Sequence, residues 1–204
     1  MKHIDSWKNK AVFKDQLALN ESELSNYPPH WKYFLNAMQI VANESNSYIL
    51  DVGCGAGVYH ELCNTHFPDV KYMGMDYSQE AIDIAKEKWG GNLWRVGSYE
   101  ELSPADADMF DILHAGAMLD VLPNGDEALQ FLLALGFKNI ILGRVKLTSE
   151  RSNFSVYEVY NKIQTYAYRH NAANLSKMIK AANYSIALLQ GEEDSCTILL
   201  KKIQ

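Results

Sequence analysis

Apolar and polar positions divide most of this chain into alternating strand-like and helix-like segments. Compact apolar runs of the kind found in buried strands occupy residues 48–52, 72–75, 93–96, 110–114 and 139–145. Helix-like stretches lie between or after these runs, at residues 58–66, 78–89, 126–135 and 171–182. Strands that alternate with helices are typical of a parallel sheet with helices on its faces, so the pattern predicts an α/β fold.

The last two strand-like runs, residues 184–189 and 196–203, are joined differently from the others. Only a short polar stretch separates them, and it is too short for the crossover that two parallel strands need. We therefore expect these two runs to pair as an antiparallel hairpin at an edge of the sheet.

The first 46 residues are more polar, with apolar residues at helical spacing before and after Pro28-Pro29. A proline suits the first turn of a helix but not its interior. The sequence therefore predicts a helical N-terminal extension over residues 1–46 and a main domain over residues 47–204. Aromatic residues of the extension either line the mouth of a pocket or pack onto the sheet. These residues are Trp7, Tyr27, Trp31 and Tyr33.

Composition narrows the class of protein. The 204 residues are 48% hydrophobic and 22% charged, which is ordinary for one soluble globular domain. The formal net charge is -6, and no cluster of basic residues extends beyond Lys201-Lys202. Because a nucleic-acid backbone requires a concentrated basic face, this balance argues against nucleic acid as a partner.

Cysteine usage and the N-terminus bear on the compartment. The three cysteines are odd in number and lack metal-ligand spacing, so we expect neither a disulfide framework nor a zinc site. The N-terminus has no apolar core of a signal peptide, and no run approaches the roughly 18 apolar residues of a membrane span. These features predict a cytoplasmic protein with no membrane partner.

The most informative motif begins where the first strand-like run ends. Residues 49–57 read Ile-Leu-Asp-Val-Gly-Cys-Gly-Ala-Gly, a buried strand that breaks into a glycine-rich turn and opens a helix. Asp76 ends the second strand-like run, one strand–helix–strand unit later, where a carboxylate can hold a ribose. Together they indicate a nucleoside-containing cofactor.

The order Asp-x-Gly-x-Gly-x-Gly, with Asp51 two residues ahead of Gly53, resembles the first motif of class I S-adenosylmethionine-dependent methyltransferases. A nicotinamide dehydrogenase would want the spacing Gly-x-Gly-x-x-Gly, whereas position 58 is Val58. The resemblance covers residues from about 48 to 204. It implies a Rossmann-like, seven-stranded, mostly parallel sheet flanked by helices, whose C-terminal hairpin places the last strand antiparallel between the fifth and sixth.

The resemblance also implies roles for the glycine turn. Asp51 would hold the methionyl ammonium of S-adenosylmethionine, directly or through water. Gly53 and Gly55 would keep the floor of the site open, with Cys54 between them in the same turn. Gly57 would allow tight packing of the strand on the helix.

The second strand end resembles the family's second motif, from Tyr72 to Ser78. There Asp76 would accept hydrogen bonds from both ribose hydroxyls, and Tyr77 would lie against the adenine. Two alternatives stay open, namely that Asp76 is an acid at a helix N-terminus and that Tyr77 serves only packing.

The third strand departs from the family. Many members place an aspartate after it to receive the adenine amino group, whereas this chain has Ser98, followed by Tyr99. A serine hydroxyl can accept that hydrogen bond, and backbone groups of the two residues can complete the contact.

The fourth strand and its exit carry the candidate base. His114 lies at the strand end, and its ordinary pKa range suits proton removal from an acceptor. A buried histidine without a chemical role is the alternative, and Asp120 is a weaker candidate that can also act as a helix cap. The Asn/Asp-Pro-Pro-aromatic motif of enzymes that methylate bases is absent here, which argues against DNA or RNA bases.

Residues 144–170 are unusually rich in arginine and aromatic residues and follow the fifth strand. Ligands of open α/β folds bind at this edge of the sheet, so we expect the segment to cover the acceptor site. Tyr157 and Tyr160 are three residues apart and would share a face if the segment were helical. The alternative is a structural helix whose tyrosines cap the sheet edge.

The sequence as a whole predicts a methyltransferase that uses S-adenosylmethionine and acts on oxygen or nitrogen of a small-molecule or glycan acceptor. Metal-independent, in-line transfer is expected, because no metal-ligand cluster is apparent. The main alternative is a catalytically inactive S-adenosylmethionine-binding partner subunit. The acceptor and the oligomeric state are left open.

Overall fold

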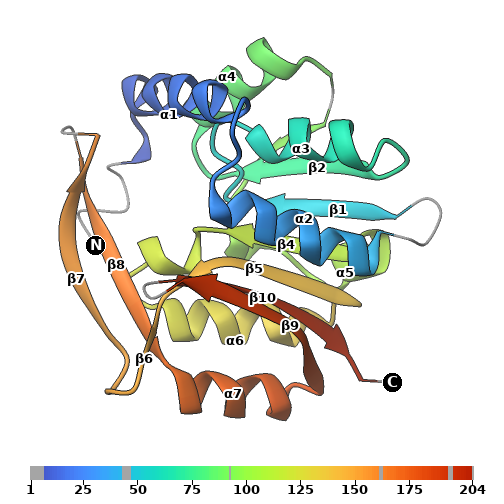
Figure 1. Cartoon of the computed structure of the whole chain (residues 1–204), viewed down its shortest axis with the longest axis vertical. Helices are drawn as coiled ribbons and strands as arrows, with labels where there is room; N and C mark the ends of the chain where they lie inside the picture. The colour runs from blue at the N-terminus through green and yellow to red at the C-terminus, as the bar shows by residue number, and fades with distance from the viewer. Residues whose placement is uncertain (1–6, 43–46, 92, 161–162, 193–194, 204) are drawn as a thin grey trace.

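The computed structural model of the protein describes residues 7–42, 47–91, 93–160, 163–192 and 195–203. Seven strands form one sheet in the order β3-β2-β1-β4-β5-β10-β9, and three form a second sheet in the order β6-β8-β7 (Figure 1). The strands of the large sheet are β1 (Tyr48–Val52), β2 (Lys71–Asp76), β3 (Trp94–Val96), β4 (Ile112–Gly116), β5 (Asn139–Val145), β9 (Tyr184–Glu192) and β10 (Ser195–Lys202).

Pairing within the large sheet matches the order expected from the alternating pattern. β3, β2, β1, β4 and β5 are parallel, and β10 lies antiparallel between β5 and β9. The predicted α/β sheet with a C-terminal antiparallel hairpin is therefore confirmed.

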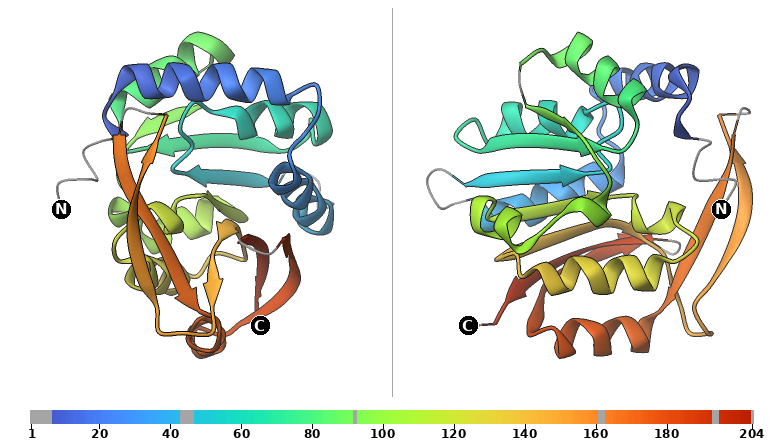
Figure 2. Two further views of the ribbon diagram at one scale, coloured as in Figure 1. Left: turned by 60° about the vertical axis from the view of Figure 1, so that its left-hand side comes forward. Right: turned by 180° about the vertical axis from the view of Figure 1, so that it is seen from behind.

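Helices cover both faces of this sheet (Figures 1 and 2). They are α1 (Lys10–Glu23), α2 (Pro29–Val41), α3 (Val58–His66), α4 (Gln79–Trp89), α5 (Pro104–Met109), α6 (Gly125–Leu135) and α7 (Ala172–Ala181). Short 3₁₀ turns occupy Tyr99–Glu101 and Leu119–Val121.

Successive strand residues point to opposite faces, which divides the interior into two main cores. Leu50 and Leu113 pack with α6 and α7 on one face. Ile49 and Ile112 pack with α2, α3 and α4 on the other. Because both faces are covered, the central strands β1, β4 and β5 are largely apolar, as the sequence pattern indicated.

The N-terminal extension contains the two predicted helices, and Pro29 is the first residue of α2. Trp31, a residue of α2, is fully buried in the core between this helix and the large sheet. It therefore packs against the sheet and does not line a pocket. α1 lies beside α4, near the carboxyl ends of the strands (Figure 1).

The segment between β5 and α7, for which the sequence left a helix open, is a second sheet, so the helical alternative is wrong. It consists of β6 (Leu147–Thr148), β7 (Asn153–Val159) and β8 (Ile163–Asn171). β7 and β8 form a long antiparallel ribbon that rises along the carboxyl ends of the large sheet (Figure 2). Most of β7 is solvent-exposed, so its sequence lacks the alternating burial that identifies a strand.

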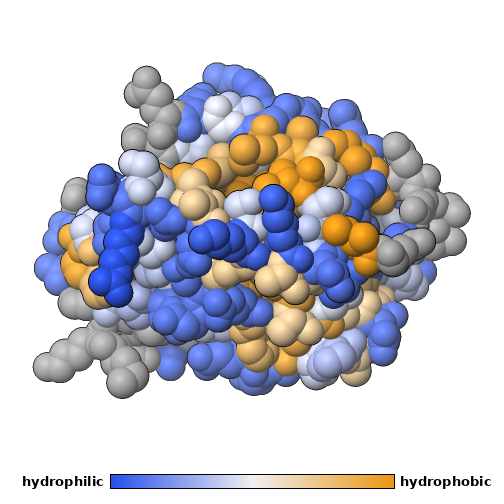
Figure 3. Space-filling model, turned by 90° about the horizontal axis from the view of Figure 1, so that it is seen from below, coloured by the Kyte–Doolittle hydropathy of each residue, from blue (hydrophilic) through white to orange (hydrophobic). Residues whose placement is uncertain are grey.

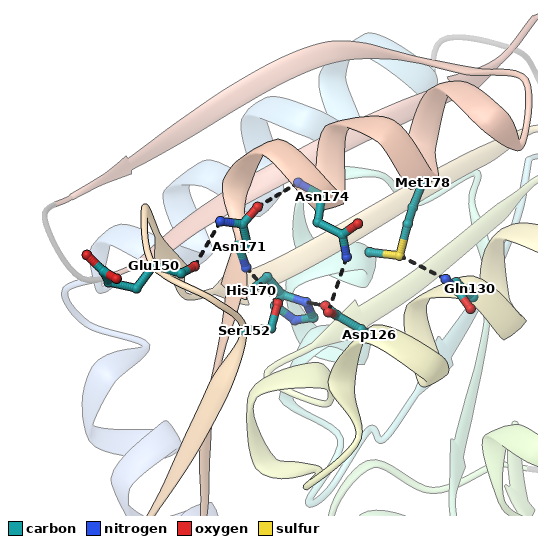
Figure 4. A network of polar contacts seen from close by, with 8 residues as sticks. All are labelled: Asp126, Gln130, Glu150, Ser152, His170, Asn171, Asn174 and Met178. Carbon is teal, nitrogen blue, oxygen red and sulfur yellow. Dashed lines mark hydrogen bonds and ion pairs between the residues drawn. The ribbon is translucent and has the colours of Figure 1, made fainter.

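A polar network anchors the lower end of this ribbon to α6 and α7 (Figure 4). Nδ1 of the buried His170 lies 2.7 Å from Oδ1 of Asp126, and Asn174 donates to Oδ2 of the same carboxylate at 3.4 Å. The backbone amide of Asn171 donates to Oγ of Ser152 at 2.9 Å. These contacts fix the direction in which the ribbon leaves the body of the molecule.

Apolar side chains are exposed on the face that carries α7 and the outer strand β9. Figure 3 shows apolar side chains gathered there among charged ones. Ile186 and Leu189 of β9 are about half exposed, at 44% and 55%. The outer edge of the large sheet therefore carries apolar surface.

Candidate active site

A cavity of about 630 Å³ lies at the carboxyl ends of β1, β2, β4 and β5, beneath α1 and the β7–β8 ribbon. This is where open α/β sheets bind their ligands, and the volume is within the range of small-molecule sites. Its charged and polar lining residues are Gln16, Asp76, Tyr77, Ser98, Tyr99, Glu100, Asp120, Asn124, Arg144, Tyr157 and Tyr160.

The glycine turn forms the floor of one half of this cavity. Gly53, Gly55 and Gly57 all have positive φ, at 75°, 53° and 82°, which a side chain disfavours. A Cβ on Gly55 would lie 2.5 Å from Oε1 of Gln16, and that oxygen accepts a hydrogen bond from the Ala56 amide at 2.9 Å. The turn therefore needs glycine both for its backbone and for the approach of α1.

Asp76 lies beside this floor and is only 6% exposed. Its Oδ2 accepts from the Gly55 amide and its Oδ1 from the Ser78 amide, both at 2.9 Å. Burial raises the pKa of Asp76 to about 6, against the opposing effect of these two amides. Each carboxylate oxygen accepts more than one hydrogen bond, so both can still receive ribose hydroxyls.

Tyr77, Ser98 and Tyr99 line the same half, as the sequence predicted for an adenosine site. Ser98 starts the first 3₁₀ turn, where its hydroxyl accepts from the Glu100 amide at 3.4 Å and its own amide donates to Oε1 of Glu101 at 2.9 Å. The Tyr99 ring meets Phe131 edge-on at 5.8 Å. The polar loop after β3 is thereby held at the cavity wall.

Asp51, Cys54 and His114 are not among the residues that line the cavity. His114 is 0% exposed, and its Nδ1 lies 2.7 Å from Oδ1 of Asp51, whose Oδ2 accepts from the Tyr72 hydroxyl at 2.5 Å. Asp51 and His114 are register partners in β1 and β4, so both side chains point to the same face of the sheet.

That face is the one beneath α2 and α3, where His114 packs between the rings of Phe34 and Tyr59 at 4.7 and 4.3 Å. Sequence position at a strand end could not show which face the side chain takes. The structure therefore gives no support to a catalytic His114 or to direct contact between Asp51 and a ligand in the cavity.

The other half of the cavity holds Asp120, which the sequence offered only as a weaker candidate. It is 2% exposed, and its Oδ2 lies 3.6 Å from Nζ of Lys146. Its Oδ1 is buried without a hydrogen-bond partner among the described residues. Burial raises the pKa of Asp120 to about 6, while the positive charges of Arg144 and Lys146 oppose the rise.

Tyr157 and Tyr160 both line this half, although they do not share a helical face. Tyr157 belongs to β7, and Tyr160 follows that strand with a positive φ of 54°. Partial burial raises the pKa of both phenols, so they are neutral donors near pH 7. The prediction that residues 144–170 cover this edge of the sheet agrees with the geometry, but their role stays a prediction.

Three lining residues were not singled out as site residues from the sequence. Gln16 lies on a weakly amphipathic helix far from the motifs, and Met118 follows β4 at the position where a Cβ on Gly53 would meet it at 3.3 Å. Arg144 was noted only as part of an aromatic-rich segment. Its signal in the sequence was a lone charge inside an otherwise apolar strand.

Comparisons with known proteins agree with the resemblance seen in the sequence. The family described as "methyltransferase domain" matches residues 50–135, which include the glycine turn and Asp76. This part of the chain is similar to class I S-adenosylmethionine-dependent methyltransferases. The resemblance seen in the sequence is thus confirmed, and S-adenosylmethionine is the cofactor of this family.

Solved structures of methyltransferases share the fold of this chain. A methyltransferase from Clostridium acetobutylicum ATCC 824 aligns with a TM-score of 0.66 at 13% identity, covering 94% of this chain and 99% of that one. Magnesium protoporphyrin IX methyltransferase from Synechocystis PCC 6803, solved with bound S-adenosylmethionine, aligns with a TM-score of 0.59 at 15% identity. The alignment covers 98% of this chain and 90% of the Synechocystis enzyme.

Two curated relatives are similar in sequence. Malonyl-[acyl-carrier protein] O-methyltransferase 1 from Ilyobacter polytropus is 24% identical over 178 residues, which is 83% of this chain. Trans-aconitate 2-methyltransferase from Variovorax paradoxus is 28% identical over 86 residues, which is 42% of it. The chain spans 64% and 33% of the lengths of these two relatives.

No helix in the described ranges is long and apolar enough to cross a membrane. Nor do any three His, Cys, Asp or Glu side chains in this part of the chain come together as metal ligands do.

Proposed function

We propose that this chain transfers a methyl group from S-adenosylmethionine to an oxygen or nitrogen atom of a small acceptor. The observation that carries the proposal is that one cavity joins two chemically different halves. The glycine turn and Asp76 line one half, and Asp120 and Tyr157 line the other. A methyl donor and its acceptor can therefore meet within a single enclosed space.

The first half fits the cofactor on the geometry of its own residues. Gly53 and Gly55 line this half without side chains, and Asp76 offers carboxylate oxygens at the end of β2. We assign Asp76 to the ribose hydroxyls, Tyr77 to the adenine face, and Ser98 with Tyr99 to the adenine edge. Asp51 acts from below, by holding the end of β1 through its contacts with His114 and Tyr72.

When bound, the cofactor supplies an electrophilic methyl group on a sulfonium, which a nucleophile attacks in line. Removal of the acceptor proton falls to Asp120 in our proposal. Its pKa of about 6 leaves it ionised at neutral pH, yet basic enough to accept a proton. Oδ1 of Asp120, which has no hydrogen-bond partner among the described residues, would accept the proton of the methyl acceptor.

Tyr157 and Tyr160 bind and orient the acceptor from above. Both come from the β7–β8 ribbon, which together with α1 separates the reacting atoms from bulk water. Trp7 helps to hold this cover in place, because its Nε1 donates to Oγ1 of the buried Thr165 on β8 at 2.9 Å.

Support for a compact acceptor comes from the size of the cavity and from the relatives, whose printed names refer to malonyl-[acyl-carrier protein], trans-aconitate and magnesium protoporphyrin IX. Acceptors are accordingly proposed to be small molecules or small groups on a carrier. A glycan acceptor remains a narrower version of the same proposal. A nucleic-acid acceptor is disfavoured by the net charge of -6.

The test is a transfer assay that follows S-adenosylhomocysteine release with panels of small acids, alcohols and amines. Tyr157→Phe and Tyr160→Phe should each lower turnover about tenfold, since each removes one orienting hydrogen bond. Both variants should bind S-adenosylhomocysteine as the wild type does. Unchanged kinetics with a true acceptor would remove the tyrosines from the site.

Asp120→Asn is the matched test of the base. It should lower turnover by about two orders of magnitude, in keeping with the loss of a general base. The wild-type rate should rise with pH through about 6, and the variant should lack this dependence. Tight cofactor binding without product release from any panel would instead favour a non-catalytic cofactor-binding subunit.

A further inference from the structure

Arg144 occupies a bulge in the large sheet. Between β5 and β10 the register passes from Leu142↔Ile198 to Val145↔Cys196. Two residues of β5, Gly143 and Arg144, therefore lie opposite the single residue Thr197. A β-bulge of this kind redirects a side chain, and bulges are frequent beside active sites.

The backbone of Arg144 is also unusual. Its φ is 58°, in the left-handed region that residues with a Cβ seldom adopt. Every other residue of β5 is buried, and Arg144 alone is exposed, at the cavity wall. Strain of this type persists where the surrounding structure imposes it, and it is concentrated at binding sites. The bulge thus presents one arginine to the acceptor half.

The guanidinium of Arg144 has no hydrogen bond or ion pair with the residues that the structure describes. Neighbouring Lys146 is different, because its ammonium lies 3.6 Å from Asp120. The charge of Arg144 nevertheless reaches the acceptor half, where it opposes the rise in pKa of Asp120, Tyr157 and Tyr160. Among the described residues that line the cavity, Arg144 is the one basic side chain.

We propose that Arg144 binds a carboxylate of the methyl acceptor, so that the acceptors of this site are small carboxylic acids. This inference rests on the proposed function, since it names the acceptor of the same cavity. A planar guanidinium matches a carboxylate with two parallel hydrogen bonds. A singly charged group suits the site better than a phosphate dianion, because the ionised Asp120 lies in the same half and would repel a second negative charge.

The carboxylate of the cofactor is the competing source of such an anion. Arg144 lies on β5, and β4 separates this strand from β1 and its glycine turn. Two strand spacings amount to about 10 Å, which places the arginine on the acceptor side of the cavity. We therefore assign it to the acceptor, and the experiment below distinguishes the two sources.

The test is calorimetry on the full chain loaded with S-adenosylhomocysteine, using acids paired with their neutral amides. Benzoate and benzamide, and succinate and succinamide, serve as probes, with phenyl phosphate as the dianion. We expect at least one acid to bind tenfold or more tightly than its amide, and phenyl phosphate to bind more weakly than benzoate. Arg144→Met should abolish the preference for the acid and leave the affinity for S-adenosylhomocysteine within about twofold.

Arg169→Met is the matched control, because Arg169 is an exposed arginine of β8 that does not line the cavity. It should keep the preference for acids. Equal binding of every acid and its amide, or no binding of either, would overturn the inference. Loss of S-adenosylhomocysteine affinity in Arg144→Met would overturn it too and assign the arginine to the cofactor. If the wild type fails to bind S-adenosylhomocysteine at all, the proposed function itself fails.

Discussion

At the scale of single residues, burial of two carboxyl groups gives the cavity its chemical character. Asp76 and Asp120 each have a pKa of about 6, and desolvation is the largest cause for both. Their hydrogen-bond partners differ, since two backbone amides hold Asp76, whereas Oδ1 of Asp120 has no partner among the residues that the structure describes. The first arrangement suits binding and the second suits proton transfer.

Cofactor affinity should therefore depend on the charge of Asp76. Asp76→Asn should weaken S-adenosylhomocysteine binding tenfold or more, because hydrogen bonds to a charged group are worth about 1.5–3 kcal/mol. For the wild type, affinity should be full above pH 7 and fall as the pH drops through about 6, where the carboxylate takes up a proton. Calorimetry from pH 5 to pH 8 checks this, and a flat profile for the wild type would contradict it.

The raised pKa values of these two carboxyl groups also make the stability of the fold depend on pH. A carboxyl group whose pKa is higher in the fold than in the unfolded chain stabilises the fold fully below pH 4, and this contribution is lost as the pH rises to about 6. Asp120→Asn should accordingly be more stable than the wild type at pH 8, with a difference that shrinks toward pH 4. Urea denaturation at the two pH values measures it, and a difference that grows toward pH 4 would contradict it.

Gly57 tests the close packing beneath the glycine turn. A Cβ there would lie 2.5 Å from the Trp94 ring, at a φ of 82°. Gly57→Ala should destabilise the fold by about 2–4 kcal/mol, through backbone strain and overpacking. Gly136→Ala is the matched control, with a φ of 88° and no atom within 4 Å, and should cost only about 1 kcal/mol. Equal losses in urea denaturation would show that packing against Trp94 contributes nothing.

At the scale of elements, the sequence predicted the strands and helices that are buried against the core. The central strands β1, β4 and β5 are covered on both faces, so their apolar runs were readable, as were helix starts such as Pro29. The β7–β8 ribbon was not recognised as a pair of strands, because β7 is largely exposed and lacks alternating burial. The sequence could not show that Asp51 and His114 point away from the cavity, because a motif fixes a position along a strand but not the face that the side chain takes.

The base of the ribbon offers a prediction at this scale. Asp126→Ala would leave the buried Nδ1 of His170 without its partner, at a cost of about 1–3 kcal/mol. In the Asp126→Ala variant, hydrogen exchange should accelerate relative to the wild type more for β8 amides than for β1 amides. Asp83→Ala, which removes an exposed acid of α4, should change stability by less than about 0.5 kcal/mol. Uniform acceleration across both sheets would show that the network does not anchor the ribbon specifically.

At the scale of the whole molecule, distant segments assemble the acceptor half. The N-terminal extension contributes Trp7, the exit of β4 contributes Asp120, and the bulge and ribbon contribute Arg144 and Tyr157. The cofactor half is built mainly from the strand ends between Gly53 and Tyr99, where the sequence has its motifs. No local pattern could show that segments separated by more than a hundred residues share one cavity.

The most direct test of the account is a crystal structure of the full chain with S-adenosylhomocysteine. We predict that both ribose hydroxyls lie within hydrogen-bond distance of the Asp76 carboxylate and that the adenine lies between Tyr77 and the Ser98–Tyr99 loop. The sulfur should face the half of the cavity that holds Asp120 and Arg144. A ligand bound outside this cavity, or one whose sulfur points away from Asp120, would contradict the account.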